Sequence, residues 1–145
     1  MAGSSTRAGR GSATRPIRVL TVDDQPLFRD AARAVISATP GFEALAEVTS
    51  GEDALAIAGR LRPEFVLLDV SLPGIDGLET SRLLTATDPA LVVLLISADD
   101  DPMLRDTASE YGAIGFVAKK ELRPSILRTL WERHCGSVPA ITPPG

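Results

Sequence analysis

Residues 65–79 read FVLLDVSLPGIDGLE. The first four residues are apolar without alternation, which is typical of a central strand covered by helices on both faces. Pro73 and Gly74 then turn the chain. Asp76 and Glu79 have the spacing of a helix-capping box, so a helix is predicted to begin there. The stretch therefore predicts a buried strand, a turn and a helix, with Asp69 at the end of the strand.

The same succession of strand and helix signals continues on both sides of this stretch. Short apolar runs alternate with longer segments of helical period, as in βα units that wind a parallel sheet. The second run alternates apolar and polar side chains, so it is predicted to be an edge strand. The five predicted strands cover residues 17–22, 42–48, 64–68, 91–96 and 113–118. The predicted fold class is therefore α/β, a doubly wound parallel five-stranded sheet.

Helix start signals lie between the predicted strands. Proline stands at a first-turn position at Pro26, Pro102 and Pro124, where its missing N–H has no helical partner to lose. Gly112 provides a stop signal for the fourth helix. The five predicted helices run from residue 26 to near 40, over 51–61, from 76 to near 87, over 101–112 and from 124 to near 135.

The length of 145 residues suits one domain, predicted over residues 16–135. Residues 1–15 and 136–145 are predicted to be disordered tails. The first tail lacks the apolar segment of a secretory signal, and its glycines interrupt an amphipathic transit helix. No apolar run approaches the roughly 18 residues needed to cross a bilayer. We therefore expect a cytoplasmic protein without a membrane segment.

The charge balance argues against a nucleic-acid surface. The chain has 15 Lys and Arg against 19 Asp and Glu, a net charge of −4 at pH 7. The first 15 residues hold three arginines and no acid, so the remaining 130 carry a net charge of −7. Binding to nucleic acid needs positive charge that neutralises phosphates. DNA binding by this chain alone is therefore not expected.

Polar residues stand at the carboxyl ends of four predicted strands. Strand one ends in Asp23 and Asp24, strand three in Asp69, strand four in Ser97 and strand five in Lys119. In an open α/β sheet the carboxyl ends share one edge, and ligands bind outside it. These five side chains are therefore expected to converge on a single site.

Three carboxylates in a small space repel one another unless a cation lies among them. An oxygen-only set of ligands with room for water suits Mg²⁺. Zinc would need nitrogen or sulfur ligands, and the only histidine, His134, lies beside Cys135, far from the acidic residues in the sequence. A magnesium site is therefore predicted.

Four motifs carry a resemblance to a known family: VLTVDD at 19–24, FVLLDVSLPGIDGLE at 65–79, LLISA at 94–98 and GAIGFVAKKEL at 112–122. Together they resemble the response-regulator receiver (CheY-like) domain. The likeness extends from about Ile17 to Arg133 and implies a flavodoxin-like (βα)5 fold with strand order 2-1-3-4-5. It also implies a role in two-component signal transduction. The resemblance implies no enzyme activity beyond the chain's own phosphorylation and dephosphorylation.

The resemblance implies a role for each site residue. Asp69 would accept a phosphoryl group from a sensor histidine kinase or a phosphotransfer protein. Asp24 and Asp69 would bind Mg²⁺ directly, and Asp23 mainly through water. The backbone carbonyl of Ser71 would complete the protein ligands.

The resemblance also implies how phosphorylation is transmitted. Lys119 and Ser97 would contact the phosphoryl oxygens by ion pair and hydrogen bond. Ser97 and Phe116 resemble the switch pair of receivers, which changes the face formed by the fourth helix, fifth strand and fifth helix. That face would hold a downstream protein effector or a second copy of the chain. No effector domain follows residue 135 in this sequence, so the output is expected to be protein binding.

One feature narrows this interpretation. Many receivers carry a proline directly after the lysine, and Lys120 stands there instead, which looks more like receivers of the NarL class.

Three alternative functions compete with that of a receiver. A haloacid-dehalogenase-type phosphatase would carry its nucleophile on the first strand and a second aspartate where Ser71 stands. A flavin-binding module would need a phosphate loop rich in Ser, Thr and Gly after strand one. A phosphorylation-independent interaction module of the same fold is the remaining alternative.

Overall fold

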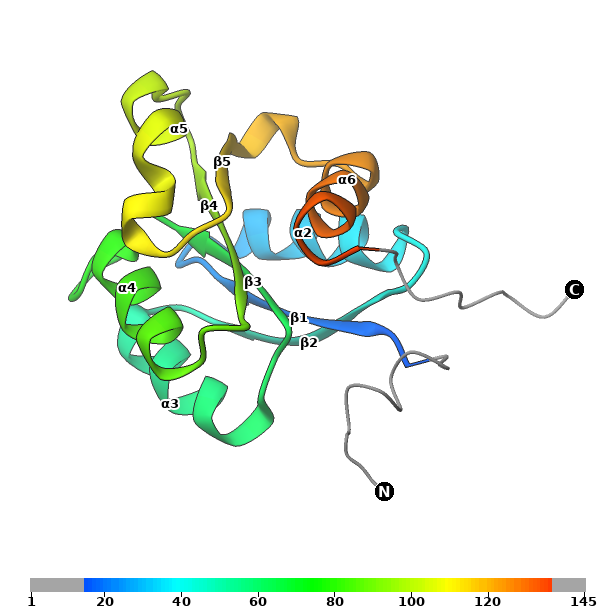
Figure 1. The fold of residues 1–145 in the computed structure, drawn as a ribbon, viewed down its shortest axis with the longest axis horizontal. Coiled ribbons are helices and arrows are strands. Elements are labelled where there is room, and N and C mark those ends of the chain that lie inside the picture. Colours follow the sequence, from blue (N-terminus) through cyan, green and yellow to red (C-terminus); the bar gives the residue numbers. More distant parts are fainter. Residues whose placement is uncertain (1–14, 137–145) are drawn as a thin grey trace, which may run out of the picture.

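The computed structural model describes residues 15–136 (Figure 1). The predicted tails therefore lie outside the described residues, apart from Arg15 and Gly136. The strands are β1 (Ile17–Val22), β2 (Phe42–Val48), β3 (Phe65–Asp69), β4 (Val92–Ser97) and β5 (Gly115–Ala118). The helices are α2 (Pro26–Ser37), α3 (Gly51–Leu61), α4 (Gly77–Thr87), α5 (Pro102–Thr107) and α6 (Pro124–Cys135), with 3-10 turns η1 (Ala108–Tyr111) and η2 (Lys119–Glu121).

All five strands are parallel, and their order across the sheet is β2-β1-β3-β4-β5. This order confirms the predicted fold class and the edge position of β2. Each change of strand requires a crossover, and the helices of the crossovers cover the two faces of the sheet. Among the described residues, no helix combines the length and the apolarity needed to cross a bilayer.

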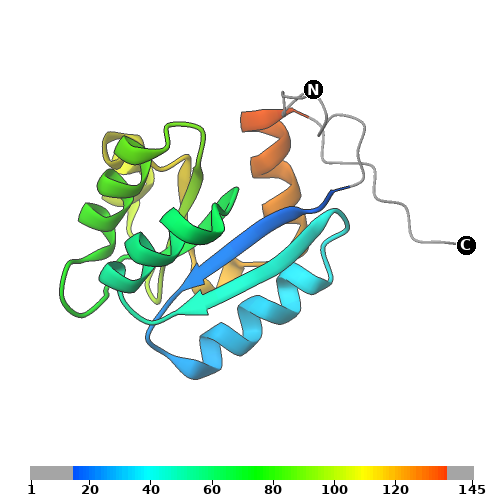
Figure 2. The same cartoon turned by 90° about the horizontal axis from the view of Figure 1, so that it is seen from below.

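Helices α2 and α6 cover one face of the sheet, and α3, α4 and α5 cover the other (Figures 1 and 2). Successive side chains of β3 alternate between the two cores. Phe65 and Leu67 pack with the α2 and α6 side, where Trp131 stacks on Phe65 with ring centroids 6.2 Å apart. Val66 and Leu68 pack with the opposite side. Burial on both faces explains why this strand shows no alternation of polar residues.

Three strands differ from their predicted bounds. Strands β3 and β4 each begin and end one residue later than expected. Their last residues belong to the parallel ladder, where Asp69 pairs with Ile96 and Ser97 pairs with Ala118. Strand β5 starts at Gly115 rather than at residue 113. The N–H of Ala113 instead donates to the carbonyl of Ala108 and closes the preceding helical turn. Asp69 and Ser97 are therefore fixed by the sheet itself.

The predicted fourth helix is not continuous. Helix α5 ends at Thr107, and the 3-10 turn η1 carries the chain to Gly112, which has a φ of 83°. Thr107 has φ −109° and ψ 4°, and its hydroxyl donates to the carbonyl of Met103. A threonine that bonds back to the preceding turn weakens the regular helical pattern. The first helix also stops at Ser37, three residues before Pro40.

Candidate functional site

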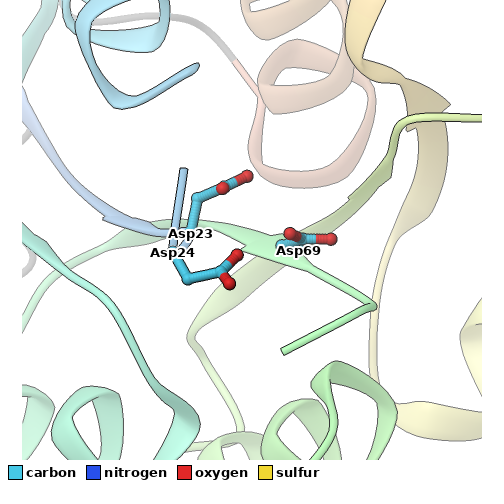
Figure 3. A group of neighbouring side chains, drawn as sticks. All are labelled: Asp23, Asp24 and Asp69. Carbon is cyan, nitrogen blue, oxygen red and sulfur yellow. The ribbon is translucent and has the colours of Figure 1, made fainter. Parts of the chain in front are cut away.

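The order of the strands brings the predicted acidic residues together. Strands β1 and β3 are neighbours, so the acidic residues after β1 lie beside Asp69 at the carboxyl edge of the sheet. Asp23, Asp24 and Asp69 each offer a carboxylate oxygen, and these oxygens lie within 4.8 Å of one another (Figure 3). Two of the residues, Asp23 and Asp69, are buried, and Asp24 is exposed. The cluster therefore has a dry side and an open side.

Asp23 is fully buried, with 0% of its surface exposed. Its Oδ1 accepts a hydrogen bond of 2.8 Å from the backbone N–H of Gln25. Its Oδ2 lies 2.6 Å from Nζ of Lys119. That contact is an ion pair whose angles are not those of a hydrogen bond, so Asp23 Oδ2 has no hydrogen-bond partner. A buried carboxylate oxygen with unused acceptor capacity is ready to accept a metal-bound water.

Asp69 is buried at the centre of the site. Its Oδ1 accepts a hydrogen bond of 2.9 Å from the backbone N–H of Ser71, and its Oδ2 lies 3.4 Å from Nζ of Lys119. Burial raises the pKa of Asp69, and the charge of Asp23 adds to this effect. The hydrogen bond from Ser71 and the charge of Lys119 oppose it. Burial therefore makes the negative charge of Asp69 costly, and a divalent cation would offset that cost.

Lys119 approaches the carboxylates from the first residue of η2. Its side chain is 12% exposed, whereas Lys120 next to it is exposed. Ser97, at the end of β4, is partly buried, and its hydroxyl accepts a weak hydrogen bond of 3.4 Å from the N–H of Asp99. The backbone N–H of Ser71 donates a hydrogen bond to Asp69. A role of the Ser71 carbonyl as a metal ligand stays a prediction.

The donor set fits a hard divalent cation. Three carboxylates supply oxygen ligands, and Lys119 offsets only part of their charge. No histidine or cysteine belongs to this group among the described residues, which leaves the set without the softer ligands that zinc prefers. Mg²⁺ commonly binds through one or two carboxylates and keeps several waters, which suits a cluster with one exposed side.

Phe116 is buried against the face that α3, α4 and α5 cover, and 4% of its surface is exposed. The guanidinium of Arg105 lies over its ring, 5.6 Å from the ring centroid. Arg105 also donates to the Phe116 carbonyl at 3.4 Å and pairs with Asp100 in the loop after β4. Arg105 therefore links this loop to the aromatic ring of Phe116, which is the predicted switch residue.

Three residues that follow Asp24 contact the site and were not among the predicted site residues. Gln25 and Phe28 both contact the ammonium of Lys119, and Arg29 donates to the carbonyl of Asp23 at 2.9 Å. Their only signal in the sequence is position, since they follow directly on the acidic pair at the edge where ligands bind. Their side chains are not of the types usually searched for as metal ligands or nucleophiles.

The fold and the site together define a class of protein, a doubly wound parallel α/β domain with an acidic cluster and a lysine at its carboxyl edge. Residues 19–130 match the family model of the response regulator receiver domain, and the chain belongs to this family. Its family role is that of a response regulator receiver in two-component signal transduction.

Individual relatives agree with this assignment. The chain is 38% identical over 117 residues to a protein-glutamate methylesterase/protein-glutamine glutaminase of Anaeromyxobacter dehalogenans, a match that covers 79% of this chain and 32% of that protein. It is 30% identical over 137 residues to the nitrate/nitrite response regulator NarL of Escherichia coli K12, covering 91% of this chain and 62% of NarL. The chain thus spans from about a third to about three-fifths of the length of these relatives.

Solved structures show the same fold. The signal receiver domain of NarL from Mycobacterium tuberculosis superposes with a TM-score of 0.75 at 31% identity, and the match covers 84% of this chain and 98% of that domain. The presence of NarL proteins among the relatives agrees with the likeness to NarL-class receivers that Lys120 suggested. The comparison confirms the predicted CheY-like, flavodoxin-like architecture.

Proposed function

We propose that Asp69 accepts a phosphoryl group from a histidine kinase or a phosphotransfer protein and that this event switches protein binding. The observation that carries the proposal is the position of Asp69, whose buried carboxylate lies within 3.4 Å of Lys119 and within the same acidic cluster as Asp23 and Asp24. A carboxylate oxygen, a lysine ammonium and an acidic cluster whose oxygens suit a divalent cation thus meet at one edge of the sheet. This combination is what phosphoryl transfer requires.

In the proposed step, a carboxylate oxygen of Asp69 attacks phosphorus and forms a new phosphorus–oxygen bond. The phosphorus–nitrogen bond of the phosphohistidine breaks, its electron pair goes to the imidazole nitrogen, and that nitrogen takes up a proton. Lys119 is placed to pair with a phosphoryl oxygen because its Nζ already lies beside Asp69 Oδ2. Ser97 would donate its hydroxyl to another of these oxygens.

Asp24, Asp69 and the Ser71 carbonyl would hold Mg²⁺, and Asp23 would act mainly through water. When bound, Mg²⁺ supplies positive charge that offsets the oxygens of the incoming phosphoryl group. The exposure of Asp24 leaves this side of the cluster open to solvent and to a donor. The protein side of the reaction then consists of orientation and charge compensation.

The proposed output is a change at the face formed by α5, β5 and α6, with Ser97 and Phe116 as the switch pair. This face would bind a downstream protein effector or a second copy of the chain. Met103 of α5 is 73% exposed, so this helix presents an apolar side chain to solvent. We further propose that the protein is located in the cytoplasm and that the receiver domain extends over residues 16–135. We also propose that the chain catalyses only its own phosphorylation and dephosphorylation. The acidic charge of residues 16–145 makes DNA binding by this chain alone unexpected.

The proposal is tested by incubating the chain with Mg²⁺ and a small phosphodonor such as phosphoramidate, followed by intact-mass measurement and mapping of the modified residue. The expected result is one phosphoryl group on Asp69, dependent on Mg²⁺. Labelling elsewhere would reject the assignment of the acceptor. No labelling at all would favour a phosphorylation-independent interaction module of the same fold.

A further inference from the structure

Four groups surround the ammonium of Lys119. Two are the carboxylates of Asp23 and Asp69, at 2.6 and 3.4 Å. The third is Oε1 of Gln25, which accepts a hydrogen bond of 3.2 Å from Nζ. The fourth is the ring of Phe28, whose centroid lies 4.7 Å from Nζ. Two neutral groups of the turn after β1 thus share the ammonium with the two acids.

The neutral contacts matter because the two carboxylates do not attract the ammonium equally. Asp23 is the closer and the more deeply buried of the two, so charge attraction alone favours contact with Asp23 over contact with Asp69. An amide oxygen and an aromatic face attract a cation without adding charge to the acidic cluster. They add attraction for Nζ that does not come from Asp23.

The start of helix α2 shows that the side chain of Gln25 is free for this contact. Gln25 is the N-cap residue of α2, yet its side chain makes no capping hydrogen bond. In contrast, the N-cap side chains of α3, α4 and α5 each accept a backbone N–H of the first turn of their helix. Pro26 follows and favours the helix start without a side-chain cap.

The backbone of Gln25 makes a second, separate contact with the site. Its N–H donates to Asp23 Oδ1 at 2.8 Å, and this bond does not depend on the side chain. Replacing Gln25 by an apolar residue other than proline therefore removes the hydrogen bond from Lys119 and leaves the contact with Asp23. The two functions of this residue can be separated by mutation.

We propose that Gln25, supported by the ring of Phe28, is a positioning residue that holds the Lys119 ammonium between Asp23 and Asp69, ready for a phosphoryl oxygen. This inference rests on the proposed function, because Lys119 is assumed to contact the phosphoryl group. It predicts that Gln25 affects the rate of phosphoryl transfer and not the affinity for Mg²⁺.

The test uses Gln25→Met, which keeps the length of the side chain and removes the acceptor oxygen. At saturating Mg²⁺ and a fixed concentration of phosphoramidate, the rate of Asp69 labelling is expected to fall roughly 3- to 10-fold, the range of one net hydrogen bond. The dissociation constant for Mg²⁺ should stay within about twofold of wild type, since the contact of the Gln25 N–H with Asp23 remains. The NMR signals of the Lys119 side chain should shift.

Two further variants complete the design. Phe28→Leu keeps an apolar side chain and removes the aromatic face, so it should slow labelling in the same direction as Gln25→Met. Leu27→Ala is the matched control, because Leu27 lies in the same turn and is 84% exposed. Its labelling rate with the small donor should equal that of wild type.

The outcomes separate the inference from the proposed function. Wild type that is labelled on Asp69, together with a Gln25→Met rate equal to wild type, would overturn the positioning role. An equal loss of rate and of Mg²⁺ affinity in Gln25→Met would also overturn it, because the effect would then pass through Asp23. Wild type that takes up no phosphoryl group would reject the proposed function, and the inference with it.

Discussion

Nζ of Lys119 lies 2.6 Å from Oδ2 of Asp23, a buried carboxylate oxygen that has no hydrogen-bond partner. The pair places one positive charge inside the cluster that is proposed to bind a divalent cation. Lys119 therefore has two opposed effects. It offsets carboxylate repulsion, and it competes with Mg²⁺ for the same negative charge.

Lys119→Met should separate these effects. Without the ammonium, Mg²⁺ is expected to bind about threefold more tightly or better, because the repulsion between two cations is removed. Labelling by phosphoramidate should fall by at least about tenfold, the effect typical of losing one charge-stabilising group. Isothermal titration calorimetry and labelling rates measure the two quantities. Weaker Mg²⁺ binding in this variant would contradict the competition.

Asp69→Asn should abolish labelling and stabilise the metal-free fold at neutral pH. Burial raises the pKa of Asp69, so folding makes the ionised carboxylate less favourable than it is in the unfolded chain. The stability that this preference supplies is present below the unfolded pKa and is lost as pH rises through the folded pKa. Asparagine stays neutral at all pH values and avoids that loss.

Thermal unfolding in EDTA checks this expectation. Asp69→Asn should melt a few degrees above wild type at pH 7, and the gap should narrow as pH falls toward the acid range in which Asp69 is protonated in both states. A gap that stays constant or grows on acidification would show that charge crowding is not its cause.

Asp24→Ala should weaken Mg²⁺ binding and leave the fold intact. Asp24 is the exposed member of the cluster, so its removal does not open a cavity. Loss of a direct carboxylate ligand is expected to cost about tenfold or more in affinity. Glu43→Ala is the matched control. Glu43 is an exposed acid on the edge strand β2, and its substitution removes the same charge as Asp24→Ala. Equal effects of the two variants would indicate general electrostatics instead of ligation.

The strands of the sheet, and the meeting of Asp23, Asp69 and Lys119 at its edge, could be predicted from the sequence. Central strands are buried on both faces, so β3 appears as the uninterrupted run FVLL, and parallel winding places Asp23, Asp69 and Lys119 at one edge. Contacts across long sequence separations were not accessible in this way. Gln25 and Lys119 are 94 residues apart, and their contact depends on loop paths and rotamers that no local pattern encodes.

Gly77→Ala should destabilise the site, because α4 begins against the backbone of β3. A methyl group at residue 77 would collide with the carbonyl of Asp69 and the Cα of Val70, and these backbone atoms cannot turn aside as a side chain does. The expected loss is about 2 kcal/mol, as for overpacking in a core. Chemical denaturation measures it.

Gly59→Ala is the control for that experiment. A Cβ at residue 59 meets nothing within 4 Å, and the residue lies inside α3. Alanine should stabilise the helix there by about 0.5–1 kcal/mol. If the two substitutions had similar effects, the close approach of α4 to Asp69 would not explain the need for glycine at residue 77.

The last prediction concerns how phosphorylation of Asp69 reaches the α5–β5–α6 face. A phosphoryl group adds about −1.5 to −2 charge and new acceptor oxygens, which should draw the Ser97 hydroxyl inward and rearrange the loop after β4. Arg105 ties that loop to Phe116 through Asp100 and through the aromatic ring. A movement of the loop is therefore expected to alter the packing of Phe116, with a coupling on the order of 1–3 kcal/mol.

Phe116→Ala tests this relay but removes a buried ring, at a cost of about 3 kcal/mol or more. Phe116→Leu keeps most of the volume, and Arg105→Met keeps the helix and removes the charge, so the three variants are compared. Each folded variant should be labelled within about twofold of wild type, since the site contacts of Asp69 remain. The phosphorylation-dependent change in hydrogen exchange of α5 and α6 should shrink in all three. A response as large as that of wild type would mean that the signal travels by a route other than Phe116 and Arg105.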